Sequence, residues 1–307
     1  MRPQKGDLMK KSRRSLLIFL CAVLAVVTVI FFIYRWREQV KGSNNRPVIS
    51  CPDYPLRVSV SAIDNTDLLL QDVTASDMED GDITDSIVVE SISQFVETGH
   101  CIVTYAAFDN NNRVAKATRH LYFTDYTSPT FDIIAPLEFS YSTNFSPLEC
   151  IEAHDCIDGD ITKRVKMTWL NADDDITNIG AHNVEFSVTN SMGDTVRLEA
   201  EIVVYDRTYT ELRLIPTIKL KQYLMYVEPN MYVDFIGDVV ESISVMGEDH
   251  SVADYEARFG KLTVDEGGFD ANEPGTYRVL YTCENGSEYV GSAVLIVIVK
   301  GGEINNG

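Results

Sequence analysis

The chain has 307 residues, 45% of them hydrophobic, and a formal net charge of −20. This length is enough for two or three small domains, each with its own hydrophobic core. Residues 1–46 contain ten Lys/Arg and two Asp/Glu and so carry +8, which leaves −28 for residues 47–307. A surface that acidic repels nucleic acid and anionic lipid and attracts cations, so we exclude nucleic acid as a partner.

An unbroken apolar run of 18 residues extends from Leu16 to Ile33. As a helix it is roughly 27 Å long, close to the hydrocarbon core of a bilayer. Tyr34 and Trp36 follow it as interfacial aromatics. We therefore predict a basic cytoplasmic tail over 1–15, a transmembrane helix over 16–34 and a juxtamembrane linker over 35–46.

A cleaved signal peptide and a lipoprotein are the competing interpretations of this apolar run. The run is longer than the usual signal core, and Arg35-Trp36-Arg37 stands where a small-x-small cleavage site would be. Leu20 precedes Cys21, where a lipid-attachment site usually has a small residue. The sequence thus favours an uncleaved membrane anchor. More Lys/Arg precede the span than follow it, which predicts a cytoplasmic amino terminus and an extracellular carboxyl-terminal bulk.

Beyond the linker, short runs of β-branched and aromatic residues alternate with turn residues, and no segment shows a sustained 3.6-residue period. This pattern predicts an all-β region. We place a first module over residues 47–127. In it, a strand through Cys101–Ala107 is followed by a turn at Asp109–Asn112 and a second strand over Val114–Phe123.

An acidic motif repeats within this region. Asp80-Gly81-Asp82-Ile83-Thr84 recurs 78 residues later as the segment 158–162, and the residues just before it match as well. Five identical residues at a fixed offset indicate a tandem array of similar modules. We place a second module over 128–208 and a degenerate third module over 209–300, with a disordered tail over 301–307. The third module lacks the motif and keeps only the ending, a turn at 273–277 and two strands up to Val299.

The chain carries the acidic motif, a Pro-Gly-Thr-Tyr-type turn into an alternating strand, Asp-Asn before the last strand, and Asp-x-Thr-x-Pro into the next repeat. Together these features resemble the bacterial immunoglobulin-like repeats. Such repeats occur on surface proteins and in some pesticidal crystal proteins, and they are related to the hyalin repeat. The resemblance covers about residues 47–210 well, and beyond that only 274–299. It implies a β-sandwich of about seven strands per module and no catalytic activity. The second module departs from the pattern at 178–182, where the usual Pro and Tyr are missing.

The repeated motif has two interpretations. As a turn, its aspartates hydrogen-bond backbone amides, its glycine takes a positive φ, and its isoleucine enters the core. As a calcium loop, it offers clustered carboxylate oxygens, although its spacing is not that of the twelve-residue helical loop. The candidate calcium ligands are Asp77, Asp80, Asp82, Asp155, Asp158 and Asp160. Calcium is the one cofactor that the sequence suggests.

Six cysteines are present, five of them outside the apolar run, so at least one is unpaired or intermolecular. Cys150 and Cys156 flank the start of the second acidic loop and could form a disulfide there. Cys283 occupies an inward-facing strand position and is predicted to be a buried thiol. The triplet His154-Asp155-Cys156 is by itself a weak signal for a metal or a nucleophile.

No nucleophile-elbow, phosphate-loop or zinc-protease motif occurs in the sequence. We therefore expect a non-enzymatic bacterial cell-surface protein, a membrane-anchored stalk or adhesion-type binding module for a protein or glycan ligand. The alternative is an accessory or sensing subunit of a membrane protein complex that docks a partner through these modules. A stalk should expose polar faces throughout, whereas a subunit should show one sizeable apolar patch.

Overall fold

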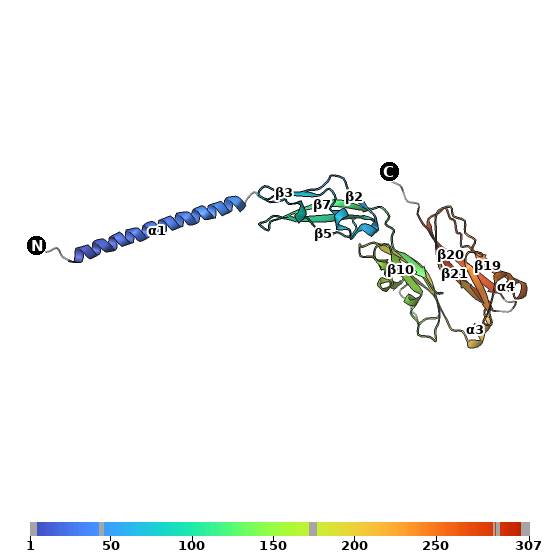
Figure 1. Ribbon diagram of the computed structural model, residues 1–307. Helices are drawn as coiled ribbons and strands as arrows, with labels where there is room; N and C mark the ends of the chain where they lie inside the picture. The colour runs from blue at the N-terminus through green and yellow to red at the C-terminus, as the bar shows by residue number, and fades with distance from the viewer. Residues whose placement is uncertain (1–4, 43–45, 172–176, 285, 287–288, 302–307) are drawn as a thin grey trace. The chain divides into compact units, whose positions relative to one another are not determined.

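The computed structural model of the protein describes residues 5–42, 46–171, 177–284, 286 and 289–301. The chain is mostly β, with several sheets that form sandwich-like domains, and it has one long apolar helix near its amino terminus (Figure 1). The predicted fold class is confirmed. Of the predicted tail over 301–307, all but Gly301 lies outside the described residues.

Helix α1 extends over Lys5–Gly42 and is longer than predicted at both ends. Neither Pro nor Gly occurs between Asp7 and Lys41, so nothing in this stretch breaks the helix where the apolar run ends. Residues 35–42, predicted as linker, are therefore helical. Within α1 the segment Ile18–Trp36 has a mean hydropathy of 2.5 and is long and apolar enough to cross a membrane.

The first sandwich has one three-stranded and one four-stranded sheet, in the orders β1-β3-β4 and β2-β7-β6-β5. Their bounds are β1 Val48–Ser50, β2 Leu56–Val58, β3 Thr74–Asp77, β4 Gly81–Asp82, β5 Val88–Ile92, β6 His100–Phe108 and β7 Val114–Phe123. Strands β6 and β7 are the two strands predicted before and after the turn at 109–112. A short helix, α2 (Thr66–Leu69), lies between β2 and β3.

The second sandwich repeats this plan with sheets β11-β10-β8 and β12-β13-β14-β9. Their bounds are β8 Thr130–Ile133, β9 Glu138–Ser140, β10 Ile151–Asp155, β11 Gly159–Asp160, β12 Lys166–Trp169, β13 Gly180–Thr189 and β14 Thr195–Tyr205. The long hairpin of β13 and β14 pairs Gly180 with Val204 at one end and Thr189 with Thr195 at the other. Edge strand β9 runs parallel to β14.

The third sandwich has sheets β15-β17-β18 and β16-β21-β20-β19. Their bounds are β15 Thr217–Leu220, β16 Leu224–Val227, β17 Val240–Val245, β18 Glu248–His250, β19 Leu262–Asp265, β20 Gly275–Glu284 and β21 Val290–Val299. Helices α3 (Tyr209–Leu214) and α4 (Val252–Arg258) belong to the stretch whose sequence fits the repeat poorly. Both are two turns or less, too short for a 3.6-residue period to show in sequence.

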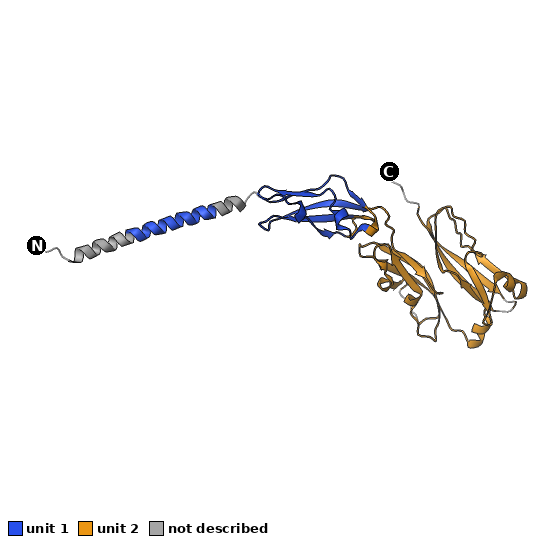
Figure 2. Cartoon of the chain, in the orientation of Figure 1, with its two compact units in different colours: residues 1–57, 62–93, 101–122 blue, residues 58–61, 94–100, 123–307 orange. Residues whose placement is uncertain are grey.

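Tertiary contacts divide the chain into two compact units (Figure 2). Unit 1 comprises residues 1–57, 62–93 and 101–122, and unit 2 comprises 58–61, 94–100 and 123–307. In unit 1 the core of the first sandwich is formed by inward residues of β6 and β7, among them Val103, Tyr105 and Leu121, all without exposed surface. The buried Tyr105 hydroxyl donates to the Leu69 carbonyl over 2.7 Å, which satisfies its hydrogen bond at the edge of the core.

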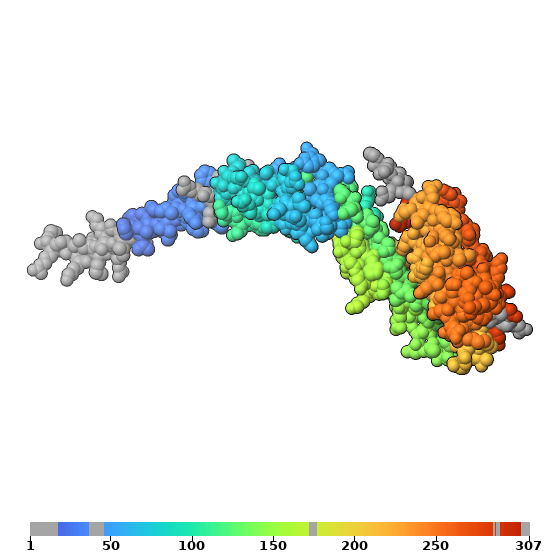
Figure 3. Space-filling model, turned by 45° about the vertical axis from the view of Figure 1, so that its right-hand side comes forward, coloured from blue at the N-terminus to red at the C-terminus, as the bar shows by residue number. Residues whose placement is uncertain are grey.

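Unit 2 contains two hydrophobic clusters, one in each of its sandwiches. The second sandwich's cluster also includes Leu224 and Ile296 of the third, and the Phe131 amide donates to the Tyr226 hydroxyl over 3.0 Å. The surfaces of these two sandwiches accordingly lie side by side in Figure 3, the second in green and the third in orange. Cys283 is fully buried in the cluster of the third sandwich, as predicted.

Candidate functional site

The two acidic loops have the same backbone structure. Asp77 pairs with Gly81 across β3 and β4, and Asp155 pairs with Gly159 across β10 and β11. Both glycines have positive φ, 76° and 70°, a conformation in which a Cβ is disfavoured. The predicted turn is therefore present in both repeats.

The first aspartate of each loop closes a short turn. Asp77 Oδ1 accepts from the amides of Glu79 and Asp80 over 2.8 and 3.1 Å. Asp155 Oδ1 does the same with the amides two and three residues later, over 2.9 and 2.8 Å. Both aspartates are buried, at 8% and 7% exposure. The repeats differ at the second carboxylate oxygen, because Oδ2 of Asp155 accepts a hydrogen bond whereas Oδ2 of Asp77 has no donor.

The last aspartate of each loop caps the following turn. Asp82 Oδ1 accepts from the amide and the hydroxyl of Thr84 over 3.0 and 2.7 Å. Asp160 Oδ1 accepts from the Thr162 amide over 2.9 Å. The Thr84 hydroxyl and amide lower the pKa of Asp82, and the Thr162 amide and hydroxyl lower that of Asp160.

The middle aspartate fastens the loop to the hairpin turn of the long strand pair. Asp80 accepts from the amide and the side-chain amide of Asn110 over 2.9 and 2.8 Å. Asp158 accepts from the amide and hydroxyl of Ser191 over 2.6 and 2.7 Å and forms an ion pair with Arg164. Burial raises the pKa of Asp158, but the bonds from Ser191 and Arg164 outweigh it, so that the net shift is downward.

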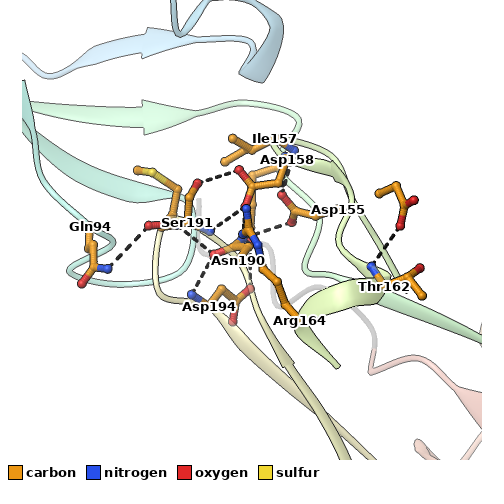
Figure 4. A network of polar contacts seen from close by, with 12 residues as sticks. Gln94, Asp155, Ile157, Asp158, Thr162, Arg164, Asn190, Ser191 and Asp194 are labelled. Atoms are coloured by element: carbon orange, nitrogen blue, oxygen red, sulfur yellow. Dashed lines mark hydrogen bonds and ion pairs between the residues drawn. The ribbon is translucent and has the colours of Figure 1, made fainter. Parts of the chain in front are cut away.

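In unit 2, this turn is the centre of a larger polar network, shown in Figure 4. Asn190 is buried, and its side-chain nitrogen donates to Asp155 Oδ2 over 3.0 Å and to the Tyr126 hydroxyl over 2.8 Å. Tyr126 in turn donates to Asp194 Oδ2 over 2.7 Å. Burial raises the pKa of Tyr126 and so keeps this hydroxyl a donor. Every side chain in this chain of bonds has a partner, which rigidifies such networks.

Segment 94–96 joins the same network in unit 2. The Phe95 amide donates to the Met192 carbonyl over 2.9 Å, and the Phe95 ring meets the Tyr126 ring edge-on with centroids 4.6 Å apart. Gln94 reaches the Ser191 carbonyl at 3.5 Å (Figure 4). The joint aspartate, Asp125, accepts from the Val60 amide and the Ser59 hydroxyl over 2.7 and 2.6 Å.

A groove in unit 2 lies between the second and third sandwiches and has a volume of about 580 Å³. Its apolar wall includes Ile133, Leu137, Ile218 and Ile296, and two ion pairs line it, Glu185–Arg197 and Glu201–Arg278, each 2.6 Å long. Glu138 also lines the groove. Burial raises the pKa of its carboxyl, and the positive charge of Arg207 offsets part of this rise. A concave site with an apolar wall and a few polar groups is typical of ligand binding.

The structure gives the six candidate calcium ligands hydrogen bonds within their own loops and turns. In the described parts of the chain, no group of three or more His, Cys, Asp or Glu side chains is arranged to hold a metal ion. Calcium binding by the loops stays a prediction. The aspartates of the loops were predicted as site residues from the sequence, whereas Asn190, Asp109 and Tyr126 were not. Asp109 and Asn190 could have been found from the sequence, because each comes directly after one of two matching strands, β6 and β13.

All six cysteines are free thiols in the structure. The disulfide considered between Cys150 and Cys156 is absent: Cys150 is buried beside the Pro136 carbonyl, and the exposed Cys156 donates to the Thr127 carbonyl over 3.2 Å. His154 lies beside Asp132 and Glu152, 3.8 Å from each carboxylate, in an exposed position. That arrangement assembles no nucleophile with Cys156.

No family model matches the chain. A stretch of 135 residues is 29% identical to the pesticidal crystal protein Cry22Aa of Bacillus thuringiensis and covers 42% of this chain but only 18% of that protein. This weak homology agrees in part with the expected resemblance, which included crystal proteins. The immunoglobulin-like repeat family itself is supported only loosely.

Solved structures share low similarity with the chain. A carbohydrate-binding-module structure of Clostridium perfringens ZmpB, in complex with GlcNAc and with INT domains, matches 50% of this chain and 29% of its own, with 18% identity and a TM-score of 0.23. The lipoprotein BT2262 of Bacteroides thetaiotaomicron matches 55% of this chain and 98% of its own, with 14% identity and a TM-score of 0.22. Drosophila N-cadherin EC1-4 matches 84% of this chain and 76% of its own, with 12% identity and a TM-score of 0.21. Likenesses of this size support neither a ligand nor an activity for this chain.

Proposed function

We propose that the chain is a non-enzymatic, single-pass protein of a bacterial cell surface that displays sandwich modules as a binding stalk. Its apolar segment Ile18–Trp36 serves as an uncleaved anchor, with the basic amino terminus in the cytoplasm. The acidic residues 47–307 are then outside the cell. Their charge keeps the modules soluble and apart from anionic lipid.

The observation that carries the proposal is the network around Asn190. A displayed binding module needs its loops and turns held in place by internal contacts. In unit 2 the joint residues Phe95 and Tyr126 bond directly to the turn 190–194 of the second sandwich, and the buried Asn190 links Tyr126 to Asp155. Side chains so connected hold this part of unit 2 rigid, as a displayed binding module requires.

The groove between the second and third sandwiches is the binding surface that we assign to this function. Its two Arg–carboxylate pairs offer donors and acceptors in fixed geometry, and its wall offers apolar contact. A glycan or a short peptide with both hydroxyl or amide groups and apolar faces would match these groups.

The second candidate is an accessory or sensing subunit that docks a partner protein. A specific feature favours it: Met231, Tyr232 and Ile236 of the third sandwich lie close together in sequence and are exposed by 55%, 86% and 41%. They line a shallow hollow with Val264 and Phe269. Exposed apolar side chains grouped in this way mark protein interaction sites.

The two candidates are separated by a binding experiment with matched variants. The detergent-solubilised full chain is applied to an array of glycans. In parallel, the chain in its native membrane is crosslinked to neighbouring proteins on intact cells of the producing species. The groove variant Arg197→Ala/Arg278→Ala should lose glycan binding, whereas Lys300→Ala, which removes an exposed ion pair to Glu228 outside the groove, should keep it.

A different pattern would favour the subunit. If Tyr232→Ser alone abolishes crosslinking to one membrane protein and the groove variant has no effect on any binding, the stalk proposal is wrong. Chemical conversion of a bound ligand by the purified chain would contradict the non-enzymatic assignment.

A further inference from the structure

The two repeats differ at one buried position in the hairpin turn. In the first repeat, the Arg113 and Asn111 amides donate to Asp109 Oδ1 over 2.7 and 2.8 Å. In the second repeat, the equivalent amides donate to Asn190 Oδ1, each over 3.0 Å. Asp109 and Asn190 thus occupy the same place in the same turn, and one is a carboxylate where the other is an amide.

Each turn is also fixed against its acidic loop in the same way. The residue that follows Asp109 bonds to Asp80, and the residue that follows Asn190 bonds to Asp158, each with its amide and its side chain. By this correspondence we place the Asp109 side chain beside Asp77, where the second repeat has Asn190 beside Asp155. This equivalence holds within unit 1 for the first pair and within unit 2 for the second.

In the second repeat the amide nitrogen of Asn190 satisfies Asp155 Oδ2. In the first repeat that donor is missing: Asp77 Oδ2 and Asp109 Oδ2 are both buried and neither has a hydrogen-bond partner. The two residues are 8% and 5% exposed. Arg113 Nε lies 3.9 Å from Asp109 Oδ2, an ion-pair distance that is too long for a hydrogen bond.

Two buried acceptors without a donor destabilise the fold, because each oxygen has lost its hydrogen bonds to water and has gained none from the protein. Arg113 supplies one positive charge beside Asp109, and Glu79 and Asp80 add negative charge close by, since both bond to the same turn. A cation at this position would neutralise the pair and take the place of the missing amide.

We propose that the first repeat, but not the second, binds a hard cation between Asp77 and Asp109, with calcium as the ion to test. Carboxylate oxygens are the ligands that calcium prefers, and two carboxylates need backbone carbonyls or water to complete its six to eight ligands. Because the described side chains supply so few ligands, the affinity belongs in the range of extracellular modules, about 10⁻⁴ to 10⁻³ M. This inference does not depend on the proposed stalk function.

The test exchanges the two residues between the repeats in the full chain. Asp109→Asn gives the first repeat the amide that the second already uses, so it should fold and should lose the calcium response. Asn190→Asp gives the second repeat the carboxylate pair, so it should melt at a lower temperature in chelator and recover when calcium is added. Calorimetric titration with CaCl₂ and thermal melting of the wild type, Asp109→Asn and Asn190→Asp in detergent supply the readouts.

We expect one calcium site in the wild type, a raised melting temperature at 10 mM calcium, and at least a tenfold weaker affinity in Asp109→Asn. Magnesium, which demands an octahedral shell, should give a smaller shift than calcium. The proposal is overturned if the wild type shows neither heat nor a melting shift at 10 mM calcium. It is equally overturned if Asp109→Asn keeps the full response of the wild type.

Discussion

Asn190 donates its side-chain amide to the buried carboxylate of Asp155 over 3.0 Å, and this bond links the hairpin turn of the second sandwich to its acidic loop. The same amide donates to Tyr126, so one buried side chain connects a loop, a turn and a joint within unit 2.

Asn190→Ala should destabilise the protein by about 1–3 kcal/mol, because the buried Asp155 Oδ2 loses its donor and Tyr126 loses a partner. Chemical denaturation followed by tyrosine and tryptophan fluorescence measures the change. Asn183→Ala, at an exposed position of the same strand pair, is the control and should be close to neutral. Equal effects of the two variants would mean that the network contributes nothing to stability.

The protein should lose stability in acid through the hydrogen-bonded aspartates. Ser191 and Arg164 hold the pKa of Asp158 below its ordinary value despite its partial burial, and Thr162 does so for Asp160. A carboxylate with a lowered folded-state pKa contributes stability that is complete above its unfolded pKa of about 4 and is lost as the pH falls through the folded value. Thermal melting between pH 7 and pH 2 should therefore show a decline that begins below about pH 4.

Asp158→Asn provides the matched variant for this pH dependence. It removes one of the titrating groups, so its melting temperature should fall less between pH 5 and pH 2 than that of the wild type. A decline of the same size in both proteins would assign the acid loss to other carboxylates.

Phe186→Ala should cost about 3–5 kcal/mol, because Phe186 is fully buried in the core of the second sandwich and its removal leaves a cavity. Phe108, at the end of the equivalent strand of the first sandwich, is 43% exposed. Phe108→Ala should therefore cost much less in the same denaturation experiment. A similar cost for both would contradict the core assignment.

The sequence was sufficient for the all-β class, the amino-terminal apolar helix and the strands on either side of the turn at 109–112, because alternation and turn residues are local signals. It could not show that Asn190 lies on Asp155, since the two are 35 residues apart and meet only when β10 and β13 are assembled. Helices α3 and α4 were missed because they are short. Nor could the length of α1 be predicted from hydropathy, because the helix continues through the polar residues that flank the apolar run.

The most direct test of the account is the location of residues 47–307 in intact cells. A membrane-impermeant maleimide should label the exposed Cys156 of the full chain without permeabilisation. A Ser12→Cys variant in a Cys51→Ser/Cys156→Ser background should be labelled only after the membrane is opened, because the proposed topology has the basic tail inside. Labelling of Ser12→Cys in intact cells, with Cys156 of the unmodified chain protected, would contradict the proposed orientation and with it the display of the modules on the cell surface.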